Sequence, residues 1–147
     1  MPAKLTEICG ALAGSLAAVA WEIGTVTVSR RNLVAVDPDD MAAPVMFVTP
    51  GSVDIQRIGR NSHQYDYTAN VFIGRQAATE TAADDMLTLT EAVAAKIRAH
   101  AWAQPWAGGV TSPVALTVEI NPDDALAERN VWRAVISATY RVNVVDA

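Results

Sequence analysis

The sequence is poor in residues that build cross-links and metal sites, since its 147 residues include one cysteine and two histidines. Cys9 has no partner for an internal disulfide, so an apolar core must stabilise the fold, which a chain of this length can provide. Cys9, His63 and His100 lie far apart, and no His-x-x-x-His or Cys-x-x-Cys spacing occurs. We therefore expect no bound metal. A single cysteine does not decide between an oxidising and a reducing compartment, although it favours the cytoplasm.

Charged residues are also few, and cations are the scarcer kind. Charged side chains make up 18% of the chain, with 11 Lys and Arg against 16 Asp and Glu, for a net charge of -5. Sequence-reading nucleic-acid binding needs clustered cations, whereas the only adjacent basic pair is Arg30 and Arg31. An acidic protein can still lie beside DNA without binding it tightly. Soluble domains average about 25% charged residues, so part of the surface could be covered by neighbouring subunits. The 27 alanines weaken that inference, because they make much of the apolar fraction small.

Long hydrophobic runs are missing. The longest, from Ile8 to Trp21, is rich in Gly and Ala and shorter than the ~20 residues of a membrane span, so no membrane association is expected. Lys4 before the run and Ala18-Val19-Ala20 at its end leave a signal peptide as an alternative. Glu7 and the weak hydrophobicity of the run oppose it.

Recognised catalytic and nucleotide-binding motifs are absent as well. The sequence has no Gly-x-x-x-x-Gly-Lys, Gly-x-Gly-x-x-Gly or Gly-x-Ser-x-Gly. The acidic pairs Asp84-Asp85 and Asp123-Asp124 are sequence neighbours, which is typical of helix starts rather than of a cleft dyad. A polar turn explains His63, and the end of a predicted helix explains His100. We therefore expect that this protein is not an enzyme and binds no cofactor.

Apolar residues at helical spacing predict two helices, one from Lys4 to about Glu22 and one from about Gln76 to His100. The first helix is apolar nearly all round, because a stripe of small residues that includes Gly10 and Gly14 lies beside its large apolar stripe. Such spacing favours close packing of the helix against a sheet. The alternative is a contact with another subunit.

The predicted strands are alternating or β-branched segments at residues 25–28, 45–48, 53–58, 64–73, 114–120 and 132–144. Pro50-Gly51 is expected to end one strand, and 102–113 to be a loop. Trp132, Ile136 and Tyr140 are expected to point into the core, and 114–120 to have one buried face. The order favours a single α+β domain over residues 1–147, with a mostly antiparallel sheet of four to six strands and two main helices packed on one face.

With these elements placed, the chain resembles the tail terminator, or tail completion, proteins of long-tailed bacteriophages over most of its length. Gln64–Ile73 is a strand followed by a helix that begins among acids. Val114–Ile120, a spacer with Asp123 and Asp124, and Arg129–Tyr140 are similar to that family's closing strand pair. The likeness is architectural and includes no invariant motif, so no family site residue is carried over.

The resemblance implies a structural virion protein of the phage neck or tail, assembled in the host cytoplasm. It implies a homo-oligomeric ring, a hexamer, that caps the head-proximal end of the tail tube, ends tube growth and offers a docking surface to the head. Its partners would be itself, the tail tube protein and a head-tail connector or head completion protein, with DNA passing through the lumen without specific binding. A head completion or connector neck protein is the alternative within this class. A small soluble ligand-binding or hydrolase domain is the alternative from another class.

The candidate interface residues lie on the first helix and in two polar turns, because turns are free to make contacts that buried elements cannot. They are Gly10 and Gly14 in the helix; Arg57, Arg60 and His63 within 56–64; and Asp123, Asp124, Glu128 and Arg129 within 123–129.

Overall fold

The fold is described from a computed structural model, which covers residues 4–31, 42–76, 79–99, 102–104, 109–111, 113–120 and 131–145. The elements in chain order are α1 (Lys4–Ala17), β1 (Thr27–Arg30), β2 (Val45–Arg57), β3 (Ser62–Gln76), α2 (Glu80–Ala99), β4 (Trp102–Gln104), β5 (Gly109–Thr111), β6 (Ala115–Ile120) and β7 (Val131–Val145). No helix among these residues combines the length and apolarity needed to cross a membrane.

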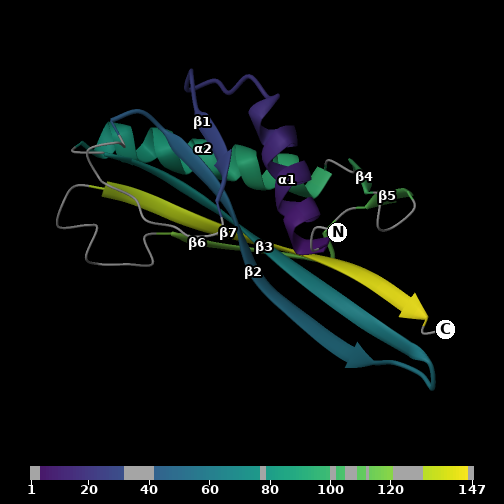
Figure 1. The fold of residues 1–147 in the computed structure, drawn as a ribbon. Coiled ribbons are helices and arrows are strands. Elements are labelled where there is room, and N and C mark those ends of the chain that lie inside the picture. Colours follow the sequence, from purple (N-terminus) through teal and green to yellow (C-terminus); the bar gives the residue numbers. More distant parts are fainter. Residues whose placement is uncertain are drawn as a thin grey trace.

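The main sheet has five strands in the order β1-β2-β3-β7-β6. Only the β1–β2 pair is parallel, and the other three pairs are antiparallel. The central strand β3 pairs with β2 on one side and with β7 on the other over nearly its whole length (Figure 1). This α+β architecture with a mostly antiparallel sheet confirms the predicted fold class.

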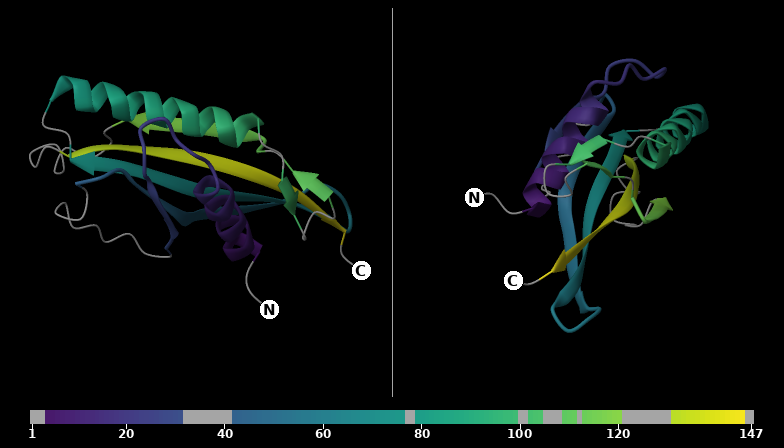
Figure 2. Two further views of the ribbon diagram at one scale, coloured as in Figure 1. Left: turned by 90° about the horizontal axis from the view of Figure 1, so that it is seen from above. Right: turned by 90° about the vertical axis from the view of Figure 1, so that its right-hand side faces the viewer.

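Both helices pack on the same face of the sheet and share one core with it. α1 contacts β1, β2 and β3, while α2 contacts β7, β3 and β6 (Figure 2). The alternating residues of β3 and β7 predicted to face inward do so: Tyr67, Ala69, Val71 and Ile73 from β3, and Trp132, Ala134, Ile136, Ala138 and Tyr140 from β7. Their burial under apolar side chains of both helices is the main stabilising contribution of the fold.

A smaller apolar cluster occupies the opposite face of the sheet. Phe47 and Phe72 stack there with ring centroids 5.8 Å apart, beside Val45 and Val131. The Arg31 guanidinium lies 4.2 Å from the centroid of the Phe47 ring. Val45 and Phe47 are buried on this face of β2, whereas Met46 and Val48 are buried on the helix side, so residues 45–48 are covered on both faces.

The helix boundaries differ from those predicted by periodicity. α1 ends at Ala17 rather than near Glu22, because the chain then turns back through Trp21 and Gly24. Gly24 has a φ of +112°, which an L side chain rarely adopts, so this glycine closes the turn into β1. α2 begins at Glu80 rather than Gln76, since β3 continues through Gln76 and Thr79 caps the helix by accepting from the Ala82 amide at 3.1 Å.

Pro50-Gly51 does not end a strand, which corrects the prediction of two separate strands at 45–48 and 53–58. β2 runs through both residues, with a bulge between Pro50 and Ser52. Proline is tolerated because β1 pairs with β2 only as far as Val48, so Pro50 lies on an edge where no amide is needed. An ideal Cβ on Gly51 would lie 2.8 Å from the Thr68 carbonyl oxygen, so glycine permits this close approach.

The segment predicted as a loop at 102–113 contains two short antiparallel strands, β4 and β5. They pair from Trp102 with Thr111 to Gln104 with Gly109. Strands of three residues are too short to show an alternating pattern, so periodicity could not detect them.

Candidate functional site

The strands β2 and β7, which flank the central strand β3, each end in a segment whose outer edge is unpaired within the described residues, and together with β3 these segments form a projecting arm. We define the arm as residues 51–57 of β2, 62–67 of β3 and 140–145 of β7. Within the described chain, β1 pairs with β2 only up to Val48 and β6 pairs with β7 only between Ala134 and Thr139. The arm extends past α1 to the β2–β3 hairpin turn (Figure 1). An unpaired strand edge is a template for another strand.

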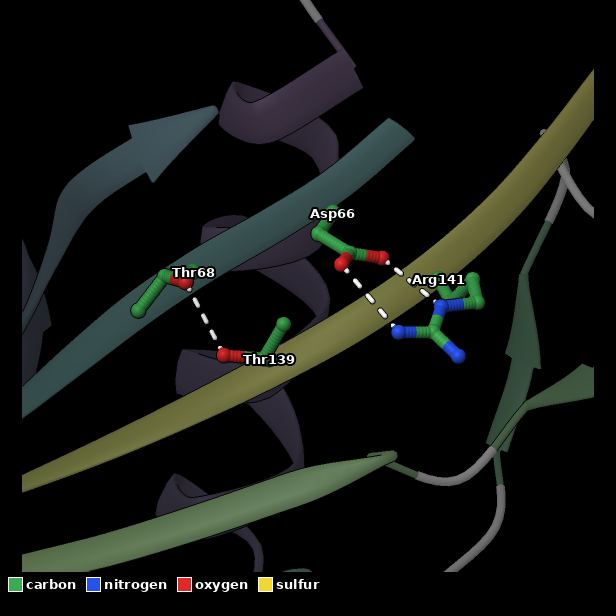
Figure 3. Close-up of polar contacts among 4 residues, drawn as sticks. All are labelled: Asp66, Thr68, Thr139 and Arg141. Atoms are coloured by element: carbon green, nitrogen blue, oxygen red, sulfur yellow. Dashed lines mark hydrogen bonds and ion pairs between the residues drawn. The ribbon is translucent and has the colours of Figure 1, made fainter. Parts of the chain in front are cut away.

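The arm and the adjoining sheet have a polar face on the side away from the helices. Thr68 and Thr139 share a hydrogen bond of 2.9 Å between their hydroxyls, and Ser137 donates to Asn70 Oδ1 at 2.9 Å. Arg141 forms a forked pair with Asp66, at 3.0 Å from Nε and 3.3 Å from the second nitrogen (Figure 3). The hydrogen bond with Asp66 raises the pKa of Arg141 above its usual value. These cross-strand contacts fix the register of β3 against β7.

The helix-side face of the arm carries exposed apolar side chains. Val53 pairs with Tyr67, and Ile55 pairs with Tyr65, so all four point to the side on which the helices pack. Ile55 is 57% exposed and Val53 is 42% exposed. The bulge at Pro50–Ser52 sets this orientation. Before the bulge the even-numbered residues Met46 and Val48 point to the helix side, and after it the odd-numbered residues of β2 do.

The arm ends in a turn that brings together three of the predicted interface residues. Arg57 and His63 are cross-strand partners, and Arg60 lies in the turn between them. The Arg57 guanidinium donates to the carbonyl oxygens of Gly59 at 3.0 Å and Arg60 at 2.9 Å. Arg57 thereby stiffens the turn, and the Arg60 side chain is exposed.

A second apolar surface lies between α2 and β6. The predicted inward side chains of β6 are only partly covered: Leu116 is half-buried, whereas Val118 and Ile120 are 40% and 43% exposed. The prediction that 114–120 has one buried face is therefore wrong, since Val114 is also exposed and Leu116 is only half-buried. A groove of about 510 Å³ separates the strand from α2, whose side of the groove is lined by the short side chains Thr90, Ala94 and Ala95 and by the longer Leu87, Glu91 and Arg98.

The glycines of α1 are not used for close packing within the subunit, which corrects the interpretation that their spacing favours. Gly10 and Gly14 are both exposed. An ideal Cβ on Gly14 would meet nothing within 4 Å, and one on Gly10 would lie 3.9 Å from Arg30 Cδ. The alternative, contact with another subunit, stays a prediction.

The remaining predicted interface residues, Asp123, Asp124, Glu128 and Arg129, lie outside the described residues. His100 also lies outside them. The structure thus brings Arg57, Arg60 and His63 together, places Gly10 and Gly14 on a separate surface, and leaves the 123–129 turn without a position.

The two most perturbed titratable groups belong to the core. Burial raises the pKa of the Cys9 thiol to about 11 and also raises the pKa of the Tyr140 hydroxyl above its usual value. Both side chains are fully buried. A thiol with this pKa is protonated near neutral pH and is not an activated nucleophile. In the described ranges, no cluster of three His, Cys, Asp or Glu side chains could hold a metal ion.

A further pocket of about 620 Å³ lies between the 19–23 turn and α2. Its polar side chains include Glu22 and Asp85, which are exposed, and Thr88, whose hydroxyl donates to its own helix at the Asp84 carbonyl oxygen, 3.0 Å away. Among the described residues that line this pocket, no nucleophile is paired with a base.

Neither protein-family models nor curated proteins match this chain.

Proposed function

We propose that this protein is a structural subunit of a phage tail terminator ring, which caps the head-proximal end of the tail tube and acts by assembly rather than by chemical turnover. The observation that carries the proposal is two strand edges, in the arm part of β2 and in β6, that no strand of the described residues covers and that carry exposed apolar side chains. A chain with such edges is suited to self-association through its sheet.

Three further observations support an assembly role. The order of elements resembles that of tail terminator proteins, above all in the antiparallel pair β6–β7. The exposed outer face of α1 leaves Gly10 and Gly14 available to another subunit. The net charge of -5 suits a ring through which DNA passes without tight binding.

Termination would follow from geometry. Subunits bind the open end of the tube, and their outward surface lacks the docking site that the next tube subunit needs. In this proposal the exposed turn with Arg60 contacts the tube or the head side, and the ring belongs to the virion neck. The head completion or connector role is the alternative, in which the same ring binds the head and not the tube.

Negative-stain micrographs of the purified protein, alone and mixed with tail tubes, test the proposal. We expect rings, and rings seated on one end of each tube. Binding to heads without binding to tubes would support the connector role instead. A protein that forms no ring in either sample would contradict both, and saturable binding of a small molecule in the 19–23 pocket would favour a ligand-binding domain.

A further inference from the structure

Most exposed large apolar side chains of the described surface gather in two places, and Val145 at the end of β7 lies apart from both. One set lies on the β2 side of the arm and at its turn: Val53, Ile55 and Ile58. The other set lies around the α2–β6 groove: Leu87, Val114, Val118 and Ile120. Single exposed apolar residues need no explanation, whereas contiguous groups mark interaction sites.

Each set adjoins an unpaired strand edge, and the two edges lie on opposite sides of the sheet. In the order β1-β2-β3-β7-β6, the free edge of the arm in β2 faces the β1 side, and β6 ends the other side. A second molecule added at one edge therefore leaves the opposite edge free for a third. This is the arrangement that a head-to-tail interface requires.

The apolar side chains at both edges also point to the same face. Val53 and Ile55 lie on the helix side through their pairing with Tyr67 and Tyr65. Val118 and Ile120 lie on the helix side through their pairing with Ile136 and Ala134 in the core. A strand that extends the sheet beside β6 with its helix-side face aligned places alternate side chains in the groove under α2.

We propose that the β2 edge of the arm in one copy pairs with the β6 edge of the next copy, so that Val53 and Ile55 fill the α2–β6 groove. Main-chain hydrogen bonds join the two sheets, and the alternating apolar side chains select the partner. The free part of β2 spans residues 51–57 and β6 spans residues 115–120, so the two segments match in length.

A second copy is the occupant because this chain supplies both halves of the contact. Pairing of two β2 edges, or of two β6 edges, would leave the other apolar surface exposed, whereas the head-to-tail pairing covers both in every copy. Repetition of such a contact closes a ring when the rotation between copies allows it. Closure of this contact into a ring rests on the proposed function, whereas the β2–β6 contact itself does not.

Disulfide cross-linking between different chains tests this contact. Ile55→Cys is mixed with a longer, tagged chain that carries Leu116→Cys, Val118→Cys or Ile120→Cys. Three positions on β6 are used so that one of them lies within disulfide distance of residue 55 in whichever register β2 pairs with β6. Cys9 is fully buried and stays in all chains. We expect a mixed dimer for at least one combination, and a ladder of covalent oligomers when both cysteines are placed in one chain.

The matched control is Asp54→Cys, which lies next to Ile55 but points to the polar face. It should give no mixed dimer with any of the three β6 positions. Disulfide dimers of Ile55→Cys alone at the yield of the mixture would overturn the proposal in favour of a symmetric β2–β2 contact.

The oligomeric state of the parent protein, measured by light scattering, separates the β2–β6 contact from ring formation. Rings without a mixed dimer would overturn the β2–β6 contact and leave the ring standing. A mixed dimer in a protein that fails to bind tail tubes would support the contact and contradict the terminator function. A monomer at high concentration without cross-linking would contradict both.

Discussion

Two glycines show that the effect of adding a side chain depends on which atoms lie next to the backbone at that position. Gly51 lies at the β2 bulge, where an ideal Cβ would be 2.8 Å from the Thr68 carbonyl oxygen. Gly14 lies on the exposed face of α1, where a Cβ would meet nothing within 4 Å. In the sequence Gly51 lies between Pro50 and Ser52, and Gly14 between Ala13 and Ser15. Only the neighbours in space distinguish the roles of the two glycines.

Alanine at these two positions should therefore act in opposite directions. Gly51→Ala forces the bulge apart and should destabilise the fold by about 1 to 3 kcal/mol, in the range of overpacked sites. Gly14→Ala should stabilise the monomer by up to about 1 kcal/mol, because alanine favours an exposed helix position more than glycine does. Urea unfolding of both variants measures this, and an equal loss of stability in the two would contradict the account.

The buried Cys9 thiol predicts how stability depends on pH. Its pKa is raised by burial from 9.0 to about 11 in the folded state, so the folded protein holds its proton where the unfolded chain releases it. The contribution is fully present below pH 9 and is lost as the pH rises towards 11. Burial of Tyr140 acts in the same direction.

We therefore expect the free energy of unfolding to fall between pH 8.5 and about 10.5, and to fall less in Cys9→Ala, whose chain lacks this ionisation. Urea titrations at several pH values provide the measurement. A stability that rises over this interval in the parent protein would contradict the burial of both groups.

At the scale of elements, sequence periodicity predicted the long strands well and their surroundings poorly. The alternation along 132–144 identified β7 and its inward side chains Trp132, Ile136 and Tyr140, because a strand with one buried face leaves a period of two. The same alternation in β6 gave the right strand but the wrong burial. Exposure of Val118 and Ile120 depends on the groove between the strand and α2, whose lining residues on α2 lie far away in sequence.

Breaks in the pattern were the other source of error. Pro50-Gly51 is normally a turn signal, and its role as an edge bulge depends on β1 stopping at Val48. The candidate interface was predictable only in part. The turn with Arg57, Arg60 and His63 was identified from its polarity, whereas the unpaired edges and the α2–β6 groove arise from topology.

The arm should contribute to assembly and little to the stability of one subunit. Ile55→Asp places a charge in the proposed contact, so we expect loss of self-association in analytical ultracentrifugation. The free energy of unfolding of the monomer should stay within about 0.5 kcal/mol, because the side chain is 57% exposed. Gln56→Asp adds the same charge to the opposite face of the arm and should keep the oligomer. Equal loss of assembly in both variants would show that net charge and not the apolar contact is decisive.

At the scale of the whole molecule, helices and sheet form one core, and the surfaces proposed to make contacts lie at its margins. The arm turn is far from the helices (Figure 2), so a change there can alter partner binding without unfolding the domain. Arg60 is the sharper probe of this turn, since Arg57 also holds the turn together through two hydrogen bonds.

Arg60→Glu, introduced into a phage that carries this gene, should leave folding and ring formation intact. It should give tails of irregular length or tails that fail to join heads, because the exposed cation is proposed to contact a partner. Lys96→Glu reverses an exposed cation on α2 and should leave virions normal. Tail lengths in electron micrographs provide the measurement, and normal virions from Arg60→Glu would exclude this turn from the contact.

The central claim is that this protein ends tail growth, and the lengths of tails made without it test that claim most directly. A phage strain that lacks the whole protein, compared with the same strain complemented by the intact gene, should produce overlong or irregular tails that do not join heads. Complementation should restore a single tail length. Tails of normal length from the strain that lacks the protein would contradict the claim.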